Sequence, residues 1–504
     1  MHRDVYVAQL SALLEQRVDV NAHLVDGTHL WGFFRAAMYF PLVEAFGTDR
    51  VPADMAARLA AAFDSAMSSR GLPIAPATAG DPVARVAAPG RGPVVIAASG
   101  PAHHRITQDG RHEAPVADAW ARLVREEGHS VLKVDVLPAW FTANQPRGLP
   151  GVSLPPVTEM DRRRAAAIVK ERWVPAIAAL FSQINPVLRS TVGIDLSSAM
   201  AGLVERAVTF VAEREVAGRW LDLVQPRAIL LVCYYETCYL SLISAARQRG
   251  IPTADLQHGM NGTVHAAYTH WTAVPDEGYD VLPDLFLTWG EPSRDNLRRW
   301  WSAPTRHRAL IAGRLDLDPT AALTDDVQVV ALAAQARAAE RCILVTLQDQ
   351  PLDPALLAEM CAAPARWLWL LRPHPSSVRI PEASAEAAAA QLAAAGVHSA
   401  VVVPLEVGTL ADLMQMAHFH ITGTSSSWMD AWMYDVPTAF IHPGADQLFA
   451  TEIADGLAYF VPNGRGVNAV IAQGASGLRT TGNTVVERGP DVARAALTTI
   501  LGTP

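Results

Sequence analysis

Gln257-His258-Gly259 is the first segment with the residue types of a catalytic site, and it comes at the end of the strand expected over 253–257. Histidine exchanges a proton readily near neutral pH, and a glycine beside it lets a substrate approach the backbone. The pattern therefore suits a general base at His258. A loop histidine that only caps nearby backbone groups fits the same spacing equally well.

A second segment, Arg372-Pro373-His374-Pro375, follows the very apolar run 367–371. A proline on each side restricts the backbone around His374 to extended geometry and so gives its imidazole a defined direction. Arg372 adds a fixed positive charge. A directed histidine beside an arginine suits charge-assisted binding of a phosphate, and a simple proline-rich turn is the alternative.

A third segment runs from Gly423 through Ser425, Ser426 and Ser427 to Asp430. Ser427 and Asp430 have the Ser-x-x-Asp spacing of a helix capping box. Hydroxyls and free backbone N–H groups at the start of a helix also suit a phosphate or pyrophosphate. The segment therefore indicates capping alone or capping combined with phosphate binding.

Single acidic residues and further histidines form a weaker set of candidates. Glu406 follows the run 401–403 and could accept hydrogen bonds from a ribose hydroxyl pair, or be a solvated loop acid. Glu236 follows Cys233-Tyr-Tyr and could act as a base or contact an acceptor. His103-His104 and the group His265, Tyr268, His270 could line an acceptor cleft, but neither has metal-ligand spacing with a third ligand.

These segments lie where short apolar runs give way to helical stretches. Runs of about five apolar residues alternating with helices predict parallel strands, which need long crossovers. In such sheets ligands bind beyond the carboxyl ends of the strands. The pattern predicts three parts: a helical segment over 1–85 and two Rossmann-like domains over 86–315 and 316–504, which the resemblance given below implies to be the acceptor domain and the nucleotide-sugar donor domain.

Composition narrows the class of protein. The chain has 504 residues and a formal net charge of −9, which argues against nucleic-acid binding through bulk positive charge. Neither a phosphate-binding GxxxxGK[ST] motif nor a strand followed by GxGxxG is present. The N-terminus lacks the pattern of a secretory signal, and the apolar run 228–235 is shorter than the ~18 residues of a membrane span. We expect a cytoplasmic protein, with peripheral association at the inner face of the membrane left open.

The order of the three motifs resembles that of GT-B glycosyltransferases of bacterial surface polysaccharides. One branch, the CDP-glycerol glycerophosphotransferases, carries an aromatic-His-Gly motif, an Arg-x-His-Pro motif and a Ser-Ser pair followed by Asp. Here these look like 257–259, 372–375 and Ser426-Ser427 with Asp430. The sequence departs from that branch at Gln257 and lacks the Thr-Pro-Leu-Lys that usually follows.

The other branch is the bacterial sialyltransferase and Kdo-transferase group, which uses CMP-activated acid sugars. It has a His-Pro motif on the donor phosphate, a later glutamate on the cytidine ribose and then a serine pair on the phosphate. His374, Glu406 and Ser425-Ser426 follow that order. The acidic base motif of some sialyltransferases has no clear match, so His258 or Glu236 would serve. The similarity covers roughly residues 228–445.

The resemblance implies an α/β, GT-B-like fold with two doubly wound domains facing a cleft. It implies transfer of a nonulosonic acid or Kdo from a CMP-sugar to a glycan, lipid-linked or protein acceptor, without a metal or other cofactor. Four alternatives stay open: a CDP-glycerol or CDP-ribitol phosphotransferase, a UDP-sugar transferase, a UDP-GlcNAc 2-epimerase and a non-catalytic GT-B scaffold.

Overall fold

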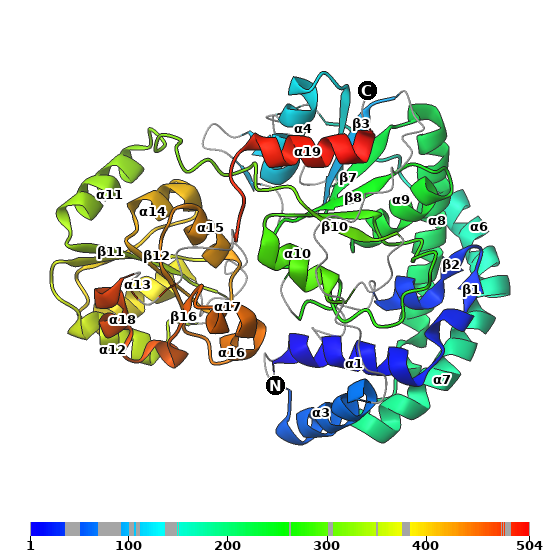
Figure 1. Ribbon diagram of the computed structural model, residues 1–504, viewed down its shortest axis with the longest axis horizontal. Coiled ribbons are helices and arrows are strands. Elements are labelled where there is room, and N and C mark those ends of the chain that lie inside the picture. Colours follow the sequence, from blue (N-terminus) through cyan, green and yellow to red (C-terminus); the bar gives the residue numbers. More distant parts are fainter. Residues whose placement is uncertain are drawn as a thin grey trace. The chain divides into compact units, whose positions relative to one another are not determined.

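Two compact units make up the chain in the computed structural model: Met1–Asp316 together with Gly489–Pro504, and Leu317–Arg488 (Figure 1). Each unit is considered by itself. The residues that the structure describes are 2–35, 51–68, 92–99, 105–106, 111–136, 149, 151–261, 264–300, 306–348, 351–374, 384–474, 476, 478 and 485–502.

The first unit contains a six-stranded parallel sheet in the order β10-β9-β8-β7-β3-β6. Its strands are β3 (Val94–Ser99), β6 (Val131–Val136), β7 (Ala228–Val232), β8 (Thr253–Leu256), β9 (Leu285–Thr288) and β10 (Arg308–Ile311). Counted along the chain this is the order 2-1-3-4-5-6 of a flavodoxin-like sheet. The topological switch point lies between β3 and β7, because β6 was added on one side of β3 and the later strands were added on the other.

Both faces of this sheet are covered, which explains why its central strand β7 is apolar at every position. In β7, Ile229 and Leu231 enter one hydrophobic core, whereas Leu230 and Val232 enter the other. The first core is shared with α1 (Arg3–Arg17), α7 (Val174–Val192), α8 (Met200–Val224) and α9 (Thr237–Arg247). The second core is shared with α4 (Pro115–Glu126) and α19 (Pro490–Leu501).

The N-terminal helices are part of this unit rather than a separate module. Helix α1 and helix α3 (Ala53–Ser68) contribute Tyr6, Leu10 and Leu59 to the same core as the sheet residue Val95. Residues 159–192, expected to be helical over 160–185, form α6 (Glu159–Ile168), a π-helical turn (Val169–Trp173) and α7 in succession.

The second unit contains another six-stranded parallel sheet, in the order β13-β12-β11-β14-β15-β16. Its strands are β11 (Arg341–Thr346), β12 (Trp367–Arg372), β13 (Ala400–Val402), β14 (Phe419–Thr422), β15 (Thr438–Phe440) and β16 (Tyr459–Phe460). Along the chain this is the order 3-2-1-4-5-6 of the dinucleotide-binding fold, whose switch point lies between the first and fourth strands. In this sheet those strands are β11 and β14.

Helices complete the second unit, and again both sheet faces are buried. Ile343 and Val345 enter one core, whereas Cys342 and Leu344 enter the other. The helices are α11 (Val327–Ala338), α12 (Pro354–Ala362), α13 (Ala385–Ala394), α14 (Leu410–Met416), α15 (Ser427–Met433), α16 (Ala445–Leu448), α17 (Ala450–Ala454) and α18 (Val467–Gln473). The expected fold class, α/β with two doubly wound parallel sheets in a GT-B-like chain, is confirmed.

The C-terminal helix differs from the sequence expectation, which placed residues up to 504 in the second domain. In the structure α19 packs on the first unit, where Ala493, Leu497 and Ile500 join the core beside α4 (Figure 1). Arg494 also forms an ion pair with Glu127 at 2.8 Å. A short amphipathic helix carries no sequence signal for which sheet it will cover. In the described part of the chain no helix has the length and apolarity needed to span a bilayer.

Candidate functional site

In the first unit, aromatic and titratable side chains gather after the carboxyl ends of β7 and β8. We call Tyr235, Glu236, His258, His265 and Tyr268 the strand-end cluster. The chain leaves β7 through a residue with positive φ, Cys233 (φ 72°), before α9 begins, and this sharp turn places Tyr235 and Glu236 at the sheet edge. The Tyr235 ring lies 6.1 Å from the His258 ring and 5.4 Å from the His265 ring, centroid to centroid.

His258 is held in one tautomer by its own backbone. Its Nδ1 lies 3.2 Å from the carbonyl oxygen of Leu256, which can only accept, so Nδ1 carries the proton. Nε2 then bears the lone pair, and the Tyr235 hydroxyl lies 3.4 Å from it. A neutral imidazole with a lone pair on the outer nitrogen is the form that a general base requires.

His265 takes the opposite tautomer. The backbone N–H of Ala267 donates to its Nδ1 at 3.3 Å, so the proton of the neutral ring is on Nε2. Burial lowers the pKa of His265 to about 4, which keeps the ring neutral at physiological pH. The two histidines beside Tyr235 therefore present an acceptor nitrogen and a donor nitrogen. The sequence had grouped His265 with Tyr268 and His270 only as residues that could line a cleft.

Glu236 is the N-cap residue of α9, and its side chain makes no capping hydrogen bond. Among the described residues nothing donates to or pairs with its carboxylate, and burial raises the pKa of this group. A carboxyl with a raised pKa holds its proton closer to neutral pH, which suits an acid or a hydrogen-bond donor.

The Gln257 side chain links the segment after β8 to the segment after β9. Its Nε2 donates to the carbonyl oxygen of Gly259 at 2.9 Å and contacts the Ser293 hydroxyl at 3.1 Å. Its Oε1 accepts the backbone N–H of Trp289 at 2.6 Å. Gln257 is buried and joins the loop after β8 to the start of α10 (Glu291–Arg298). Gln257 thus holds the backbone beside His258, with the carbonyl oxygen of Gly259 as one of its acceptors.

Asp255 lies beneath the cluster and carries no sequence motif. Its carboxylate accepts the backbone N–H of Tyr234 at 3.0 Å and the hydroxyl of Tyr268 at 2.9 Å. Complete burial raises its pKa to about 7. The only sequence signal was one acidic residue within a buried strand.

Asp255→Asn should change the pH dependence of stability. Because the folded pKa lies above the unfolded value of about 4, the native state retains a proton that the unfolded chain has lost. This group therefore makes stability fall as pH rises from about 4 to about 7. Urea unfolding at pH 4.5–7.5 should show that Asp255→Asn removes a slope of up to about one proton. Parallel curves for the variant and the wild type would contradict the raised pKa, and exposed Asp276→Asn is the control.

In the second unit, the switch point between β11 and β14 is occupied by the serine-rich segment. Ser427 is the first residue of α15, and its N-cap is Ser426. The Ser427 hydroxyl is buried and lies 3.0 Å from the Thr346 hydroxyl and 3.4 Å from Nε2 of His420. The capping box expected from Ser427 and Asp430 is therefore wrong, because the Ser427 side chain points into the sheet rather than back along the helix.

The loop before α15 is shaped by a glutamine that the sequence did not single out. Oε1 of Gln348 accepts both the N–H and the hydroxyl of Thr424, at 2.5 and 3.0 Å. A Cβ on Gly423 would collide with the same oxygen, so a larger residue there would displace the Gln348 side chain. The Ser425 hydroxyl accepts the N–H of Ser427 at 3.2 Å, so its lone pairs are partly engaged, while Ser426 makes no side-chain cap.

Arg372 has a different partner from the phosphate expected for it. Its two terminal nitrogens donate to four backbone carbonyls of the loop after β13, and the side chain is buried. The acceptors are the oxygens of Pro404, Leu405, Val407 and Gly408. The structure therefore corrects the role of Arg372 to that of a brace for the loop, since its four terminal N–H groups are occupied.

Glu406 and His374 remain as predicted ligand contacts that the geometry does not test. Glu406 is exposed in the loop that Arg372 holds, and its carboxylate interacts electrostatically with the Arg372 guanidinium. His374 is half-buried two residues after β12, and Pro375 lies outside the described residues. Across the described ranges, no three histidine, cysteine or acidic side chains converge in a way that could hold a metal ion.

Comparisons with known proteins found similar solved structures at low sequence identity. The sequence matches no protein-family model and no curated protein. Among solved structures, UDP-GlcNAc 2-epimerase from Neisseria meningitidis bound to UDP-GlcNAc is 11% identical, with a TM-score of 0.47, covering 81% of this chain and all of that one. The corresponding epimerase from Methanocaldococcus jannaschii is 10% identical (TM-score 0.45, 81% and 99% covered). A UDP-glucosyltransferase from Polygonum tinctorium is 11% identical (TM-score 0.40, 82% and 100% covered).

Proposed function

We propose that this chain is an enzyme acting on a nucleotide-activated sugar. Candidate acid–base groups lie in the first unit, and the loops that we propose for the nucleotide phosphate lie in the second. The observation that carries the proposal is the fixed tautomer of His258, which presents its Nε2 lone pair beside the Tyr235 hydroxyl at the carboxyl end of a parallel sheet. Ligands bind at this end of such sheets.

The second unit supports phosphate binding through its switch point. In the strand order 3-2-1-4-5-6, the loops after the first and fourth strands are where a nucleotide phosphate lies. Here these loops begin at Thr346 and Thr422, and the second contains Ser425 and Ser426. Backbone N–H groups and hydroxyls stabilise charge that grows on a leaving phosphate, so the reaction is expected to need no metal. Turnover in the presence of EDTA checks that expectation.

The leading activity is sugar transfer to a hydroxyl acceptor. His258 Nε2 takes the proton of the acceptor hydroxyl, the oxygen forms a bond to the anomeric carbon, and the bond from that carbon to the phosphate breaks. The nucleotide leaves with the negative charge, so atoms and charge balance. The reaction would be accelerated by positioning of the acceptor beside the anomeric carbon and by proton transfer to His258.

Epimerisation of a nucleotide sugar is the second candidate, and Glu236 favours it. Inversion at the carbon next to the anomeric centre can proceed by elimination: a base removes the proton from that carbon as the bond from the anomeric carbon to the phosphate breaks, and the nucleotide and a proton then add back across the double bond, the proton on the opposite face. That chemistry needs both a base and a protonated group, and His258 with the raised-pKa carboxyl of Glu236 provides them. UDP-GlcNAc incubated with the protein alone separates the two: a new sugar product without any acceptor indicates epimerisation.

Nucleotide binding is the first test of the proposal. A ligand that binds the folded protein raises its melting temperature in proportion to RT ln(1 + [L]/Kd). We expect a selective shift with one of CMP, CDP, UDP and GDP. A CMP or CDP shift indicates the cytidine donors that the sequence motifs favour, and a UDP shift indicates a UDP-sugar. No shift with any of the four would contradict the proposal.

Gly423→Ala should weaken that nucleotide shift. The added methyl displaces Gln348 and so breaks its two hydrogen bonds to Thr424, which moves the loop before α15. We expect Kd for the nucleotide to rise roughly tenfold, which corresponds to about 1.4 kcal/mol. Gly202→Ala is the matched control, because a Cβ there meets no atom within 4 Å. An unchanged Kd in Gly423→Ala would place the nucleotide elsewhere.

A further inference from the structure

A buried ion pair joins the N-terminal segment to the loop that carries His265. Glu15 lies on α1 and Arg35 follows the β2 strand (Thr28–His29), and their side chains are 0% and 1% exposed. Arg35 Nη1 donates to Oε1 of Glu15, which also accepts the indole N–H of Trp31 at 2.8 Å. The proposed mechanism uses neither charge.

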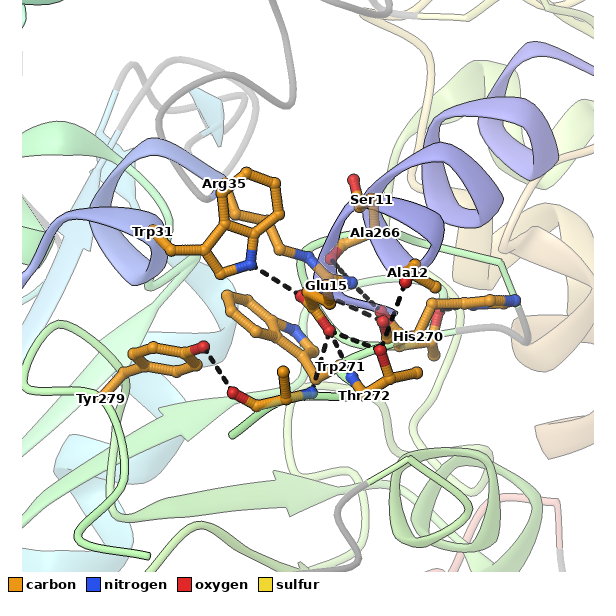
Figure 2. Close-up of polar contacts among 12 residues, drawn as sticks. Ser11, Ala12, Glu15, Trp31, Arg35, Ala266, His270, Trp271, Thr272 and Tyr279 are labelled. Carbon is orange, nitrogen blue, oxygen red and sulfur yellow. Dashed lines mark hydrogen bonds and ion pairs between the residues drawn. The ribbon is translucent and has the colours of Figure 1, made fainter. Parts of the chain in front are cut away.

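The remaining bonds of the pair go to the backbone of one loop, as Figure 2 shows. Arg35 donates to the carbonyl oxygens of Ala266 at 3.2 Å, Thr269 at 2.5 Å and His270 at 2.9 Å. Oε2 of Glu15 accepts the N–H of Thr272 and of Ala273, and the Thr272 hydroxyl at 2.8 Å. The Arg35 guanidinium also lies over the Trp271 ring, 3.9 Å from its centroid.

Two of these contacts, to Ala266 and Thr269, fall within the turn that carries His265 and Tyr268 of the strand-end cluster. The carbonyl oxygen of His265 accepts the N–H of Tyr268 at 2.8 Å and of Thr269 at 2.9 Å, so residues 265–269 form one compact turn. Arg35 bonds the peptide next to His265 and the peptide at the end of the turn. Any displacement of the pair therefore moves His265 and Tyr268 relative to Tyr235 and His258.

We propose that Glu15 and Arg35 are positioning residues for the strand-end cluster, so that the first 35 residues of the chain form a structural support for the site. The inference rests on the proposed function for its kinetic consequence. Its structural part stands on the hydrogen bonds alone. A loop bears more conformational freedom than a strand, and an ion pair with five backbone contacts removes much of it.

The test uses the full chain with Glu15→Gln and with the double variant Glu15→Gln/Arg35→Met. The double variant also removes the charge that the single change leaves unpaired, so it is the one to use if the single variant does not fold. Asp26→Asn is the matched control: Asp26 also belongs to the N-terminal segment and ties it to Arg172 and Trp173, away from the loop.

Two measurements decide the outcome. Amide hydrogen exchange should become faster at Tyr268 and Thr269, whose N–H groups bond His265 rather than Glu15, and should stay unchanged there in Asp26→Asn. With a nucleotide sugar as substrate, kcat should fall about tenfold to a hundredfold while KM changes less than about threefold. A merely structural role would lower the melting temperature without this kcat-against-KM split.

The failures are distinguishable. If folded variants keep wild-type exchange at Tyr268 and Thr269, or keep wild-type kcat, the inference is overturned. If the wild type shows no turnover of any nucleotide sugar, the proposed function fails, and the exchange measurement still decides whether Glu15 and Arg35 hold the loop.

Discussion

His258→Gln is expected to lower turnover of the nucleotide sugar by about 10²- to 10⁴-fold, the range typical for loss of a general base. Glutamine keeps a polar group of similar size, but its amide cannot take up the proton that Nε2 accepts beside the Tyr235 hydroxyl. The nucleotide contacts that we propose lie in the other unit, so the nucleotide-induced melting shift should be unchanged. The measurement is kcat by release of free nucleotide or of the epimerised sugar.

His398→Gln is the matched control for this variant. His398 is exposed in the turn before β13 and belongs to the second unit. We expect wild-type kcat and wild-type melting. A His258→Gln enzyme that retains more than about a tenth of wild-type kcat would exclude His258 as the base and direct attention to Glu236.

Arg372→Met is expected to destabilise the second unit by about 3 kcal/mol, because it leaves one buried and three partly buried carbonyl oxygens without this donor. Four carbonyls of residues 404–408 depend on this guanidinium, and no described residue offers another donor to all of them. Lysine has one nitrogen on a flexible stem and cannot reproduce the planar fork, so Arg372→Lys should recover little of the loss. Urea unfolding measured by fluorescence tests both variants.

The same experiment separates the two roles assigned to Arg372. If Arg372 bound a phosphate, as its place in the sequence near His374 suggested, its loss would reduce nucleotide affinity and leave the unliganded protein stable. The structure instead predicts that loss of the arginine destabilises the unliganded protein. Arg366→Met is the control, because Arg366 pairs with Glu340 on the surface and its side chain is 82% exposed. Equal destabilisation by both variants would contradict the brace.

The strands and their direction were predictable because burial on both faces leaves a direct record in the sequence. Runs such as 228–232 and 342–345 are apolar at every position, since alternate side chains enter opposite cores. A parallel sheet with helices on both faces is the arrangement that satisfies such runs. Once the strands are located, their carboxyl ends are known, and His258 and the serine-rich segment are thereby placed at those ends.

The sequence by itself determined that this chain has two parallel α/β sheets and that polar residues follow their strands. Only the tertiary structure decided which of those residues face a ligand and which hold the backbone. Gln257, Arg372 and Ser427 have the residue types of ligand contacts, yet each bonds to protein groups that are distant in sequence or buried beneath it. The physical reason is that a buried donor or acceptor must find a partner, and that partner is set by packing across the chain, as Glu15 and the 266–273 loop show.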